Sequence, residues 1–192
     1  MGRLDGKVAV ITGAGSGIAR AAAKIFTREG AQVVVAELNP ELGAAAALEA
    51  GNNAIFVQTD VTDEASAEAV MQQAVEHFGG LHILFNCAGG SVLEDSKVTD
   101  VDMDVWERTI PLDLKGPFLC SRFGIPHIIA SGGGAVVNVS SVVALRGNHP
   151  AHVYSSAKGG LISLTRSLAG SYSDEGVRAN VICPGLIKTD RK

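Results

Sequence analysis

The sequence predicts an α/β fold in which a doubly wound parallel sheet carries helices on both faces. Two observations predict it. Short runs rich in β-branched residues alternate with longer segments of helical pattern along the whole chain, with no internal repeat and no low-complexity linker. The short runs are almost continuously hydrophobic, as parallel strands covered on both faces require. Strands that alternate with helices are joined by crossover connections, which are nearly always right-handed and build a doubly wound sheet.

The expected elements follow one another without a long gap. The strands are Val8–Thr12, Gln32–Glu37, 54–59, Ile83–Asn86, 135–140 and 178–182. The helices between them are 17–29, Pro40–Ala50, 63–78, 102–131 and 151–173. Asp63 with Ser66 in the first turn is a start signal for the third helix, and Gly79-Gly80 is its stop signal. Pro111 marks a candidate break in the fourth helix.

The composition limits the classes of function. At 192 residues the chain fits one domain, 1–192, with enough residues for a sizeable core and no internal boundary. Hydrophobic residues make up 46% and charged residues 19%, which is typical of a folded globular protein. The net charge of −4 argues against a nucleic-acid partner. No apolar run is long enough to span a membrane and the first residues lack the apolar core of a signal peptide, so we expect a cytoplasmic protein without membrane contact.

The cysteines and histidines do not indicate a metal site. Cys87, Cys120 and Cys183 are odd in number and share no metal-ligand spacing. We therefore expect reduced, unpaired thiols and no bound metal.

A glycine-rich turn follows the first expected strand and opens the first helix. It reads Thr12-Gly13-Ala14-Gly15-Ser16-Gly17. Its glycines let the backbone turn tightly and approach a phosphate closely, and the helix N-terminus offers free N–H donors with partial positive charge. Because a strand precedes the turn and a helix follows it, the turn predicts a site for the pyrophosphate of a dinucleotide rather than a mere tight turn.

Glu37 ends the second expected strand, 20 residues after Gly17. An acidic side chain there can accept hydrogen bonds from the adenosine ribose and repels a 2′-phosphate by roughly a few kcal/mol. Position 16 is a serine, so the turn supplies no cation for that phosphate. We therefore expect NAD(H) in preference to NADP(H); the alternative is that Glu37 only solvates a strand end. Asp60, which ends the third strand, is a weaker candidate for the adenine edge.

Ser141, Tyr154 and Lys158 form the candidate catalytic group, spaced 13 and then 4 positions apart. Tyr154 and Lys158 are i and i+4 on an expected helix, so they lie on one face within reach of each other. A phenol has a pKa of about 10, but a neighbouring ammonium and a positive nicotinamide favour the phenolate. Tyr154 would then take a hydroxyl proton in oxidation or donate one in reduction, while Ser141 hydrogen-bonds the substrate oxygen. The alternative is a helix-face pair beside a capping serine.

Together these motifs resemble the short-chain dehydrogenase/reductase family of Rossmann-type oxidoreductases. The resemblance covers essentially the whole chain and rests on the glycine turn, on Asn86-Cys87-Ala88-Gly89, on Ser141…Tyr154…Lys158 and on Pro184-Gly185 followed by Thr189. The family implies NAD(P)-dependent interconversion of alcohols and carbonyls, with Lys158 also holding the nicotinamide ribose, and usually a homotetramer. A dimer is the other expected homo-oligomer. The helical segments 112–131 and 153–168 carry apolar residues on more than one face, which suits either a sister subunit or an internal core.

The resemblance also assigns the residues of the two sites. The catalytic residues would be Ser141, Tyr154, Lys158 and Asp113. The cofactor would contact Gly13, Gly15, Ser16, Gly17, Ile18, Glu37, Leu38, Asp60, Val61, Asn86, Ala88, Gly89, Tyr154, Lys158, Pro184, Gly185, Ile187 and Thr189.

The chain departs from the family pattern in two places. Ala19 replaces a third glycine, and alanine is an accepted variant of the fingerprint. Asp113 stands where the family commonly has an asparagine that anchors a water linking the lysine to solvent. An aspartate can still accept a hydrogen bond from that water, but its charge would raise the pKa of Tyr154. We therefore expect activity with a more alkaline optimum.

Several features of the substrate side stay open. Family members usually continue past position 192 with a lid, a helix and a last strand, so the sequence is either a fragment or a naturally short chain. His149 and His152 are either pocket residues or ordinary loop histidines, and the acidic segment 93–104 is expected to be a solvated loop over the site.

The function most favoured is hydride transfer between NAD(H) and a secondary alcohol or ketone. One alternative is a 3-oxoacyl-thioester (acyl-carrier-protein) reductase, although Glu37 argues against its usual NADP(H). The other is a non-catalytic dinucleotide-binding module.

Overall fold

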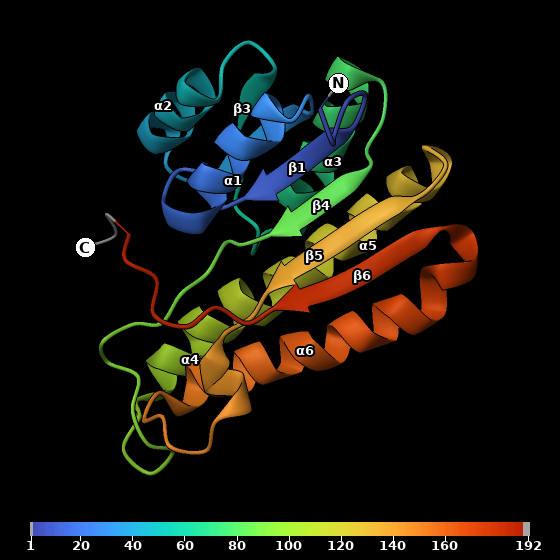
Figure 1. Ribbon diagram of the computed structural model, residues 1–192. Coiled ribbons are helices and arrows are strands. Elements are labelled where there is room, and N and C mark those ends of the chain that lie inside the picture. The colour runs from blue at the N-terminus through green and yellow to red at the C-terminus, as the bar shows by residue number, and fades with distance from the viewer. Residues whose placement is uncertain (1, 190–192) are drawn as a thin grey trace.

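The computed structural model describes residues 2–189, and in this part of the chain six parallel strands form one sheet (Figure 1). Their order across the sheet is β3-β2-β1-β4-β5-β6. The strands are β1 Val8–Thr12, β2 Gln32–Glu37, β3 Ala54–Gln58, β4 Ile83–Asn86, β5 Gly134–Val139 and β6 Val177–Ile182. The doubly wound parallel sheet predicted from the sequence is confirmed.

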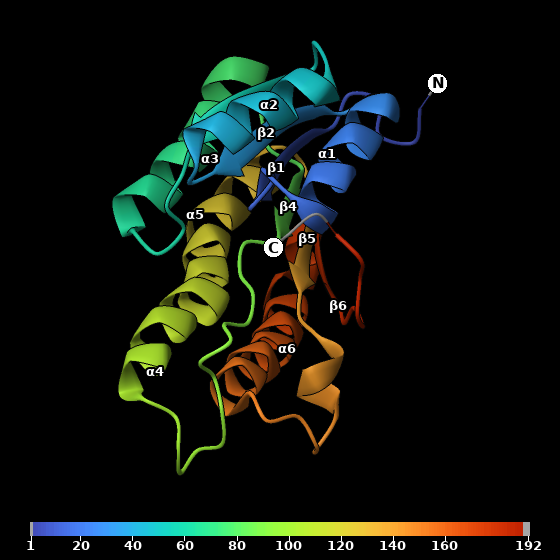
Figure 2. The same ribbon diagram turned by 90° about the vertical axis from the view of Figure 1, so that its left-hand side faces the viewer.

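Helices cover both faces of this sheet, as expected. They are α1 Gly17–Arg28, α2 Pro40–Ala50, α3 Glu64–Phe78, α4 Met103–Ile110, α5 Gly116–Ala130 and α6 His152–Tyr172, with short helical turns at Val142–Leu145 and Ser173–Glu175. One face is packed by α1 and α2, and the other by α3, α5 and α6. Figure 2 shows the strands between α1 on one side and α5 on the other.

The central strand β1 explains why the strands read as continuous hydrophobic runs. All five of its residues are buried. Successive side chains of a strand point to opposite faces, so Val10 joins the core cluster beneath α3 and α5 while Ile11 joins the cluster beneath α1 and α2. A strand buried in this way takes apolar side chains on both faces, and its one polar side chain, Thr12 at the carboxyl end, has hydrogen-bond partners.

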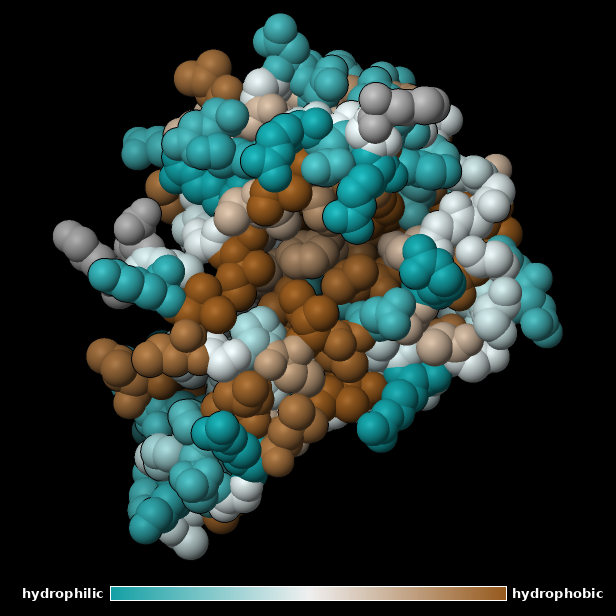
Figure 3. All heavy atoms as spheres, in the orientation of Figure 1, coloured by the Kyte–Doolittle hydropathy of each residue, from teal (hydrophilic) through white to brown (hydrophobic). Residues whose placement is uncertain are grey.

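The face that carries α1 and α2 is covered unevenly. These helices pack on β1, β2 and β3. Over β4, β5 and β6, hydrophobic side chains gather at the surface in the view of Figure 3. Ile83 and Val137 are only partly buried there, and Ile182 of β6 is 40% exposed. Within the described residues β6 is an edge strand of the sheet.

The segment expected as one helix over 102–131 is divided into two helices. A five-residue π-helical turn, Pro111–Lys115, separates α4 from α5. Proline lacks the N–H that would continue the i→i−4 pattern, and in the turn the N–H of Gly116 donates to the carbonyl of Pro111. The break near Pro111 therefore has a clear physical cause. It also fixes Asp113, which is fully buried in the middle of the turn.

His82 couples folding stability to pH. Its Nδ1 accepts a hydrogen bond from the Val8 N–H at 3.1 Å, and burial, with a smaller contribution from Lys7, lowers the pKa of this imidazole. Between the lowered pKa and the usual value of about 6.5 the unfolded chain binds more protons. This contribution to stability is therefore complete above about pH 6.5 and is lost as the pH falls through the folded-state pKa. We expect the urea midpoint to fall between pH 7.5 and 5.5.

A pair of variants isolates this effect. His82→Asn keeps an acceptor near the Val8 N–H but cannot be protonated in this range, so it should reduce the pH dependence of the urea midpoint. His77→Asn, at an exposed position on α3, should leave the dependence as it is. An unchanged dependence in His82→Asn would assign the effect to other groups.

Candidate active site

The predicted site residues lie where the carboxyl ends of β1, β4 and β5 meet at one edge of the sheet. The glycine turn follows β1, the segment 87–89 follows β4, and Ser140-Ser141 follows β5. The strand order reverses between β1 and β4, because β1 continues toward β2 and β4 toward β5. In open α/β sheets, ligands bind in the crevice at this point of reversal.

The glycine turn closes against the segment that follows β4. Gly13 has a φ of 68°, and a Cβ at this position would lie 2.7 Å from the Cα of Ala88. The hydroxyl of Thr12 accepts hydrogen bonds from the N–H groups of Cys87 and Ala88 at 3.1 and 3.2 Å. Ser16 is the N-cap of α1, and its side chain does not cap the helix. The first N–H groups of α1 therefore do not bond to a capping side chain at Ser16.

Glu37 is fixed beside the turn by two backbone donors. Its Oε2 accepts from the N–H of Gly15 and its Oε1 from the N–H of Asn39, each at 3.0 Å. A carboxylate is thus held at the end of β2, next to the glycine turn. Leu38, which follows it, is 58% exposed.

Arg20 is a residue near the turn that sequence reasoning missed. Its guanidinium donates to the carbonyl of Gly15 at 3.4 Å and forms an ion pair with Glu49 of α2. The Arg20 guanidinium donates two hydrogen bonds to the carboxylate of Glu49. These two bonds are the main cause that lowers the pKa of Glu49. Position 16 of the turn is a serine, and the nearest cation supplied by α1 is Arg20, one helical turn after Gly17. The spacing of three residues was the available signal.

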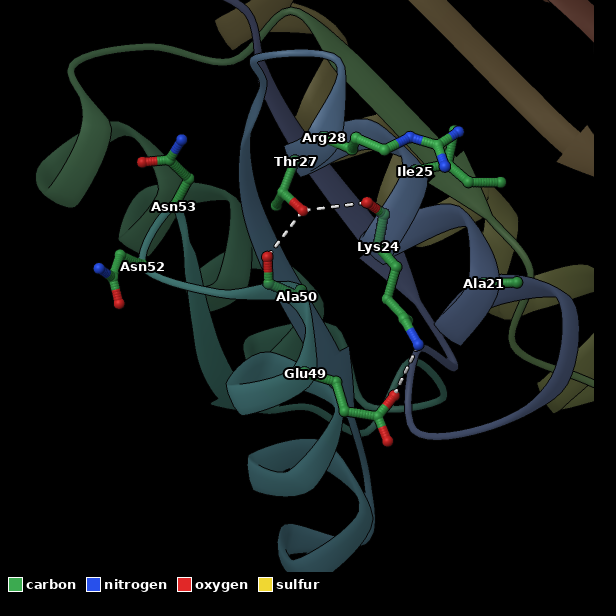
Figure 4. A pocket seen from close by; sticks show the side chains of 9 residues that line it. All are labelled: Ala21, Lys24, Ile25, Thr27, Arg28, Glu49, Ala50, Asn52 and Asn53. Carbon is green, nitrogen blue, oxygen red and sulfur yellow. Dashed lines mark hydrogen bonds and ion pairs between the residues drawn. The ribbon is translucent and has the colours of Figure 1, made fainter.

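Two hollows border these residues. One of about 870 Å³ is lined by Gly15, Ser16, Gly17, Arg20, Ala21, Lys24, Leu42, Glu49, Lys188 and Thr189. The other, of about 580 Å³, lies between α1 and the end of α2, where Lys24 contacts Glu49 and Thr27 donates to the carbonyl of Ala50 (Figure 4). None of the predicted site residues lines the second hollow. The first is therefore the candidate entrance to a nucleotide site.

Tyr154 and Lys158 are brought together on α6, as their spacing predicts. The Nζ of Lys158 lies 5.6 Å from the centroid of the Tyr154 ring. The same Nζ donates to the carbonyl of Val139 at 2.9 Å, and the hydroxyl of Ser140 donates to the carbonyl of Lys158 at 2.8 Å. Lys158 is thus anchored to the end of β5. Ser141, which is next in the chain, accepts from the N–H of Val143 at 3.3 Å.

Asp113 contacts Lys158 directly. Its Oδ1 lies 3.0 Å from the Nζ of Lys158, and the two side chains are 1% and 4% exposed. The same oxygen accepts from the N–H of Gly90 at 2.9 Å. A Cβ at Gly89 would overlap this oxygen, so the backbone approaches closely only because position 89 is glycine. The carboxylate therefore neutralises a buried ammonium.

Hydrogen bonds between buried polar side chains connect β4, β5 and α6 next to the site. The amide of Asn86 in β4 donates to Asn138 in β5 at 2.8 Å, and Asn138 donates to the hydroxyl of Thr165 in α6 at 2.9 Å. These bonds join two strand ends to the helix that carries Tyr154.

The remaining predicted residues lie along the same edge of the sheet. Asp60 follows β3 and accepts from the N–H and the hydroxyl of Thr62, while the side chain of Val61 is buried in the core. Ile18 packs against the core beneath α1. After β6, the carbonyl of Pro184 accepts a hydrogen bond from the N–H of Val142. Gly185 and Ile187 follow in the chain, and Ile187 is half-exposed. Thr189 lies against the glycine turn, 3.5 Å from where a Cβ of Gly17 would be.

The acidic segment 93–104 is not simply a solvated loop. Asp95 is only 8% exposed, and its carboxylate accepts from the N–H groups of Val153 and Tyr154. His149 and His152 also have structural partners, because their Nδ1 atoms accept from the N–H groups of Ala151 and Val98.

Among residues 2–189 no three histidine, cysteine or acidic side chains are grouped so that they could hold a metal. Among the described residues Cys87, Cys120 and Cys183 form no disulfide, and burial raises the pKa of Cys120 to about 12. No helix in this range has the length and apolar character needed to cross a membrane.

The chain is similar to several known proteins. The family described as short chain dehydrogenase matches residues 7–192. A meso-2,3-butanediol dehydrogenase of Serratia marcescens is 41% identical over 194 aligned positions, covering 98% of this chain and 74% of that protein. A cis-4-hydroxycyclohexanecarboxylate dehydrogenase of Sinomonas cyclohexanicum is 40% identical over 185 positions, covering 95% and 74%. A crystal structure from Burkholderia xenovorans, assigned to the short-chain dehydrogenases/reductases, superposes with a TM-score of 0.92 at 34% identity, covering 98% and 77%.

Proposed function

This chain belongs to the short-chain dehydrogenase/reductase family of oxidoreductases, and we propose that it transfers a hydride between NAD(H) and a secondary alcohol or ketone. The observation that carries the proposal is the pairing of Tyr154 with Lys158. The ammonium lies 5.6 Å from the phenol ring, at the sheet edge where the glycine turn opens. A phenol beside a fixed positive charge is suited to proton exchange with an alcohol oxygen.

The residues present fit a nicotinamide dinucleotide. Gly13 lets the turn approach Ala88 closely. The side chain of Ser16 does not cap α1, so backbone N–H groups at the start of this helix can bind a pyrophosphate. Glu37 lies at the position from which a carboxylate binds ribose hydroxyls, and Thr189 lies against the turn. When bound, this cofactor supplies the hydride acceptor or donor.

The chain's own side chains would then manage the proton. Tyr154 would take the hydroxyl proton of an alcohol in oxidation and return a proton to the carbonyl oxygen in reduction. The charge of Lys158 favours the phenolate form that this transfer needs. Ser141 would donate a hydrogen bond to the reacting oxygen, where negative charge develops. The ion pair with Asp113 and the carbonyl of Val139 hold Lys158 in place for this role.

The fixed carboxylate of Glu37 supports NAD(H) over NADP(H). We expect Glu37→Gln to raise the ratio of kcat/KM with NADP⁺ to that with NAD⁺ at least about tenfold, because the variant keeps the shape and an acceptor for the Gly15 N–H but loses the charge that repels a 2′-phosphate. Glu41→Gln, at an exposed position in the first turn of α2, should leave the ratio unchanged. An unaltered ratio in Glu37→Gln would contradict this assignment of cofactor preference.

The substrate class is tested by a panel of reactions. The names of the relatives refer to a butanediol and a hydroxycyclohexane carboxylate, both secondary alcohols, which supports this class for the present chain. Oxidation of meso-2,3-butanediol and cis-4-hydroxycyclohexanecarboxylate with NAD⁺ is expected. Preferential reduction of a 3-oxoacyl thioester with NADPH would instead favour the thioester reductase. NADH binding, measured by fluorescence, without any turnover would indicate a non-catalytic module.

We also propose a cytoplasmic homo-oligomer, either a dimer or a tetramer. Large apolar side chains on α4 and α5 support it, since Met103, Trp106 and Phe118 are 61%, 41% and 49% exposed. Burial of such residues against a second subunit would remove apolar surface from water. A molar mass measured by light scattering tests this directly, and a monomer would contradict it.

A further inference from the structure

The helix that carries Tyr154 begins without a capping side chain of its own. The N-cap of α6 is Ala151, whose methyl group cannot accept a hydrogen bond. The first N–H groups of a helix have no partner within the helix and need an acceptor from elsewhere. A side-chain oxygen normally serves the N–H groups two and three residues after the N-cap. In α6 these belong to Val153 and to Tyr154 itself.

Asp95 supplies this cap from a distant part of the chain. Its Oδ2 accepts from the N–H of Tyr154 at 2.7 Å, and its Oδ1 from the N–H of Val153 at 3.2 Å. The side chain comes from the segment between β4 and α4, 59 residues before Tyr154. A negative charge at this end of a helix is also stabilised by the helix dipole. The carboxylate is therefore placed as an N-cap would be, but from another element.

Two further bonds join the same segment to α6. The N–H of His152 donates to the carbonyl of Ser96 at 3.1 Å, and the N–H of Val98 donates to the Nδ1 of His152 at 3.0 Å. The first three N–H groups of α6 thus all bond to the segment 95–98. This clamp ties the start of the helix to a loop that follows the cofactor-side residues 86–89.

Tyr154 and Lys158 are held by different means. Lys158 is fixed inside the protein by Asp113 and by the carbonyl of Val139. Tyr154 lies in the first turn of α6, the part of a helix that frays when its N–H groups lose their acceptors. The distance between the phenol and the ammonium therefore depends on the clamp. A displacement of about 1 Å at a reacting group can lower a rate by about 10²-fold.

We propose that Asp95 is a positioning residue for the reaction. By accepting hydrogen bonds from backbone N–H groups at the start of α6, it holds Tyr154 in position. The inference rests on the proposed function, because it assigns Asp95 a role in that same proton transfer. Asp95 does not itself exchange a proton with the substrate. Its two carboxylate oxygens bond to backbone N–H groups of α6.

The test uses Asp95→Ala in the full chain, with Glu94→Ala as the matched control because Glu94 is the exposed neighbour in the same loop. Steady-state kinetics use NAD⁺ and the alcohol of the panel that is oxidised fastest. We expect Asp95→Ala to lower kcat about ten- to hundredfold, while the Kd for NADH, measured by fluorescence, changes less than twofold. Amide hydrogen exchange at Val153 and Tyr154 should become at least about tenfold faster. Glu94→Ala should change none of these values.

A second variant restores a cap locally. Ala151→Ser in the Asp95→Ala background gives α6 its own capping hydroxyl, so it should slow the amide exchange again and recover part of kcat. The proposal is overturned if exchange is unchanged in Asp95→Ala, if exchange rises without loss of kcat, or if NADH binding weakens as much as kcat falls. If the wild-type protein oxidises or reduces nothing in the panel, the proposed function fails and the catalytic part of this role fails with it, while amide exchange still reports whether Asp95 caps α6.

Discussion

Tyr154→Phe is expected to lower kcat by about 10³-fold while NADH binding remains intact. The variant removes only the hydroxyl that exchanges a proton with the substrate, and general acid–base groups contribute typically about 10²- to 10⁴-fold. The ring itself stays, so its contact with the ammonium of Lys158 at 5.6 Å and the packing of α6 should be kept. Steady-state rates with NAD⁺ and an alcohol, beside a fluorescence titration with NADH, measure the two effects separately.

Tyr172→Phe is the matched control for this variant. It removes the hydroxyl of the other of the two tyrosines, which lies on the same helix and packs against the core beneath α3 and α5. It should keep full activity. If Tyr154→Phe retains most of its turnover, Tyr154 is not the acid–base group and the proposed mechanism is wrong.

The fold could be predicted because its signals are local. Nearly continuous hydrophobic runs marked the inner strands, and β1 shows the reason, since all five of its residues are buried. The edge strand β6 is less continuous, because Arg178 and Asn180 interrupt its apolar residues. Tyr154 and Lys158 could be paired for a similar reason, because a spacing of four places two side chains on one face of a helix. Periodicity and short spacing are physical consequences of one element's geometry, so a sequence reveals them without any knowledge of the tertiary structure.

The parts that could not be predicted depend on contacts between distant segments. Asp95 was assigned to a solvated loop, yet its carboxylate caps a helix that begins 57 residues later. Nothing in the composition of an acidic loop distinguishes the one side chain that turns inward. The ion pair between Arg20 and Glu49 joins α1 to α2, and only the folded chain brings these two side chains together. The direct contact of Asp113 with Lys158 joins the π-helical turn Pro111–Lys115 to α6, and no pattern within one element indicates such a contact.

Asp113→Asn is expected to shift the pH–rate profile of alcohol oxidation by about one to two units toward acid. The substitution keeps the shape of the side chain and an oxygen that can accept from the Gly90 N–H, but removes the negative charge. For unit charges separated by several ångströms, Coulomb's law with an effective dielectric constant near 20 gives roughly 2 kcal/mol, and each pKa unit corresponds to about 1.4 kcal/mol. Losing this charge leaves the ammonium of Lys158 uncompensated, so the pKa of Tyr154 should fall and the phenolate should form at lower pH.

The presence or absence of this shift separates two roles for the ion pair. If Asp113 only holds Lys158 in place through its Oδ1, the asparagine oxygen can replace it and the profile of kcat against pH should not move. If the carboxylate also offsets the charge felt by Tyr154, the profile must move toward acid. Asp113→Leu removes the acceptor as well as the charge and leaves a buried ammonium unpaired, so its free energy of unfolding should fall by about 3–5 kcal/mol in urea titrations. An acid shift in Asp113→Asn without a comparable loss of stability would therefore assign the natural aspartate to the tuning of Tyr154.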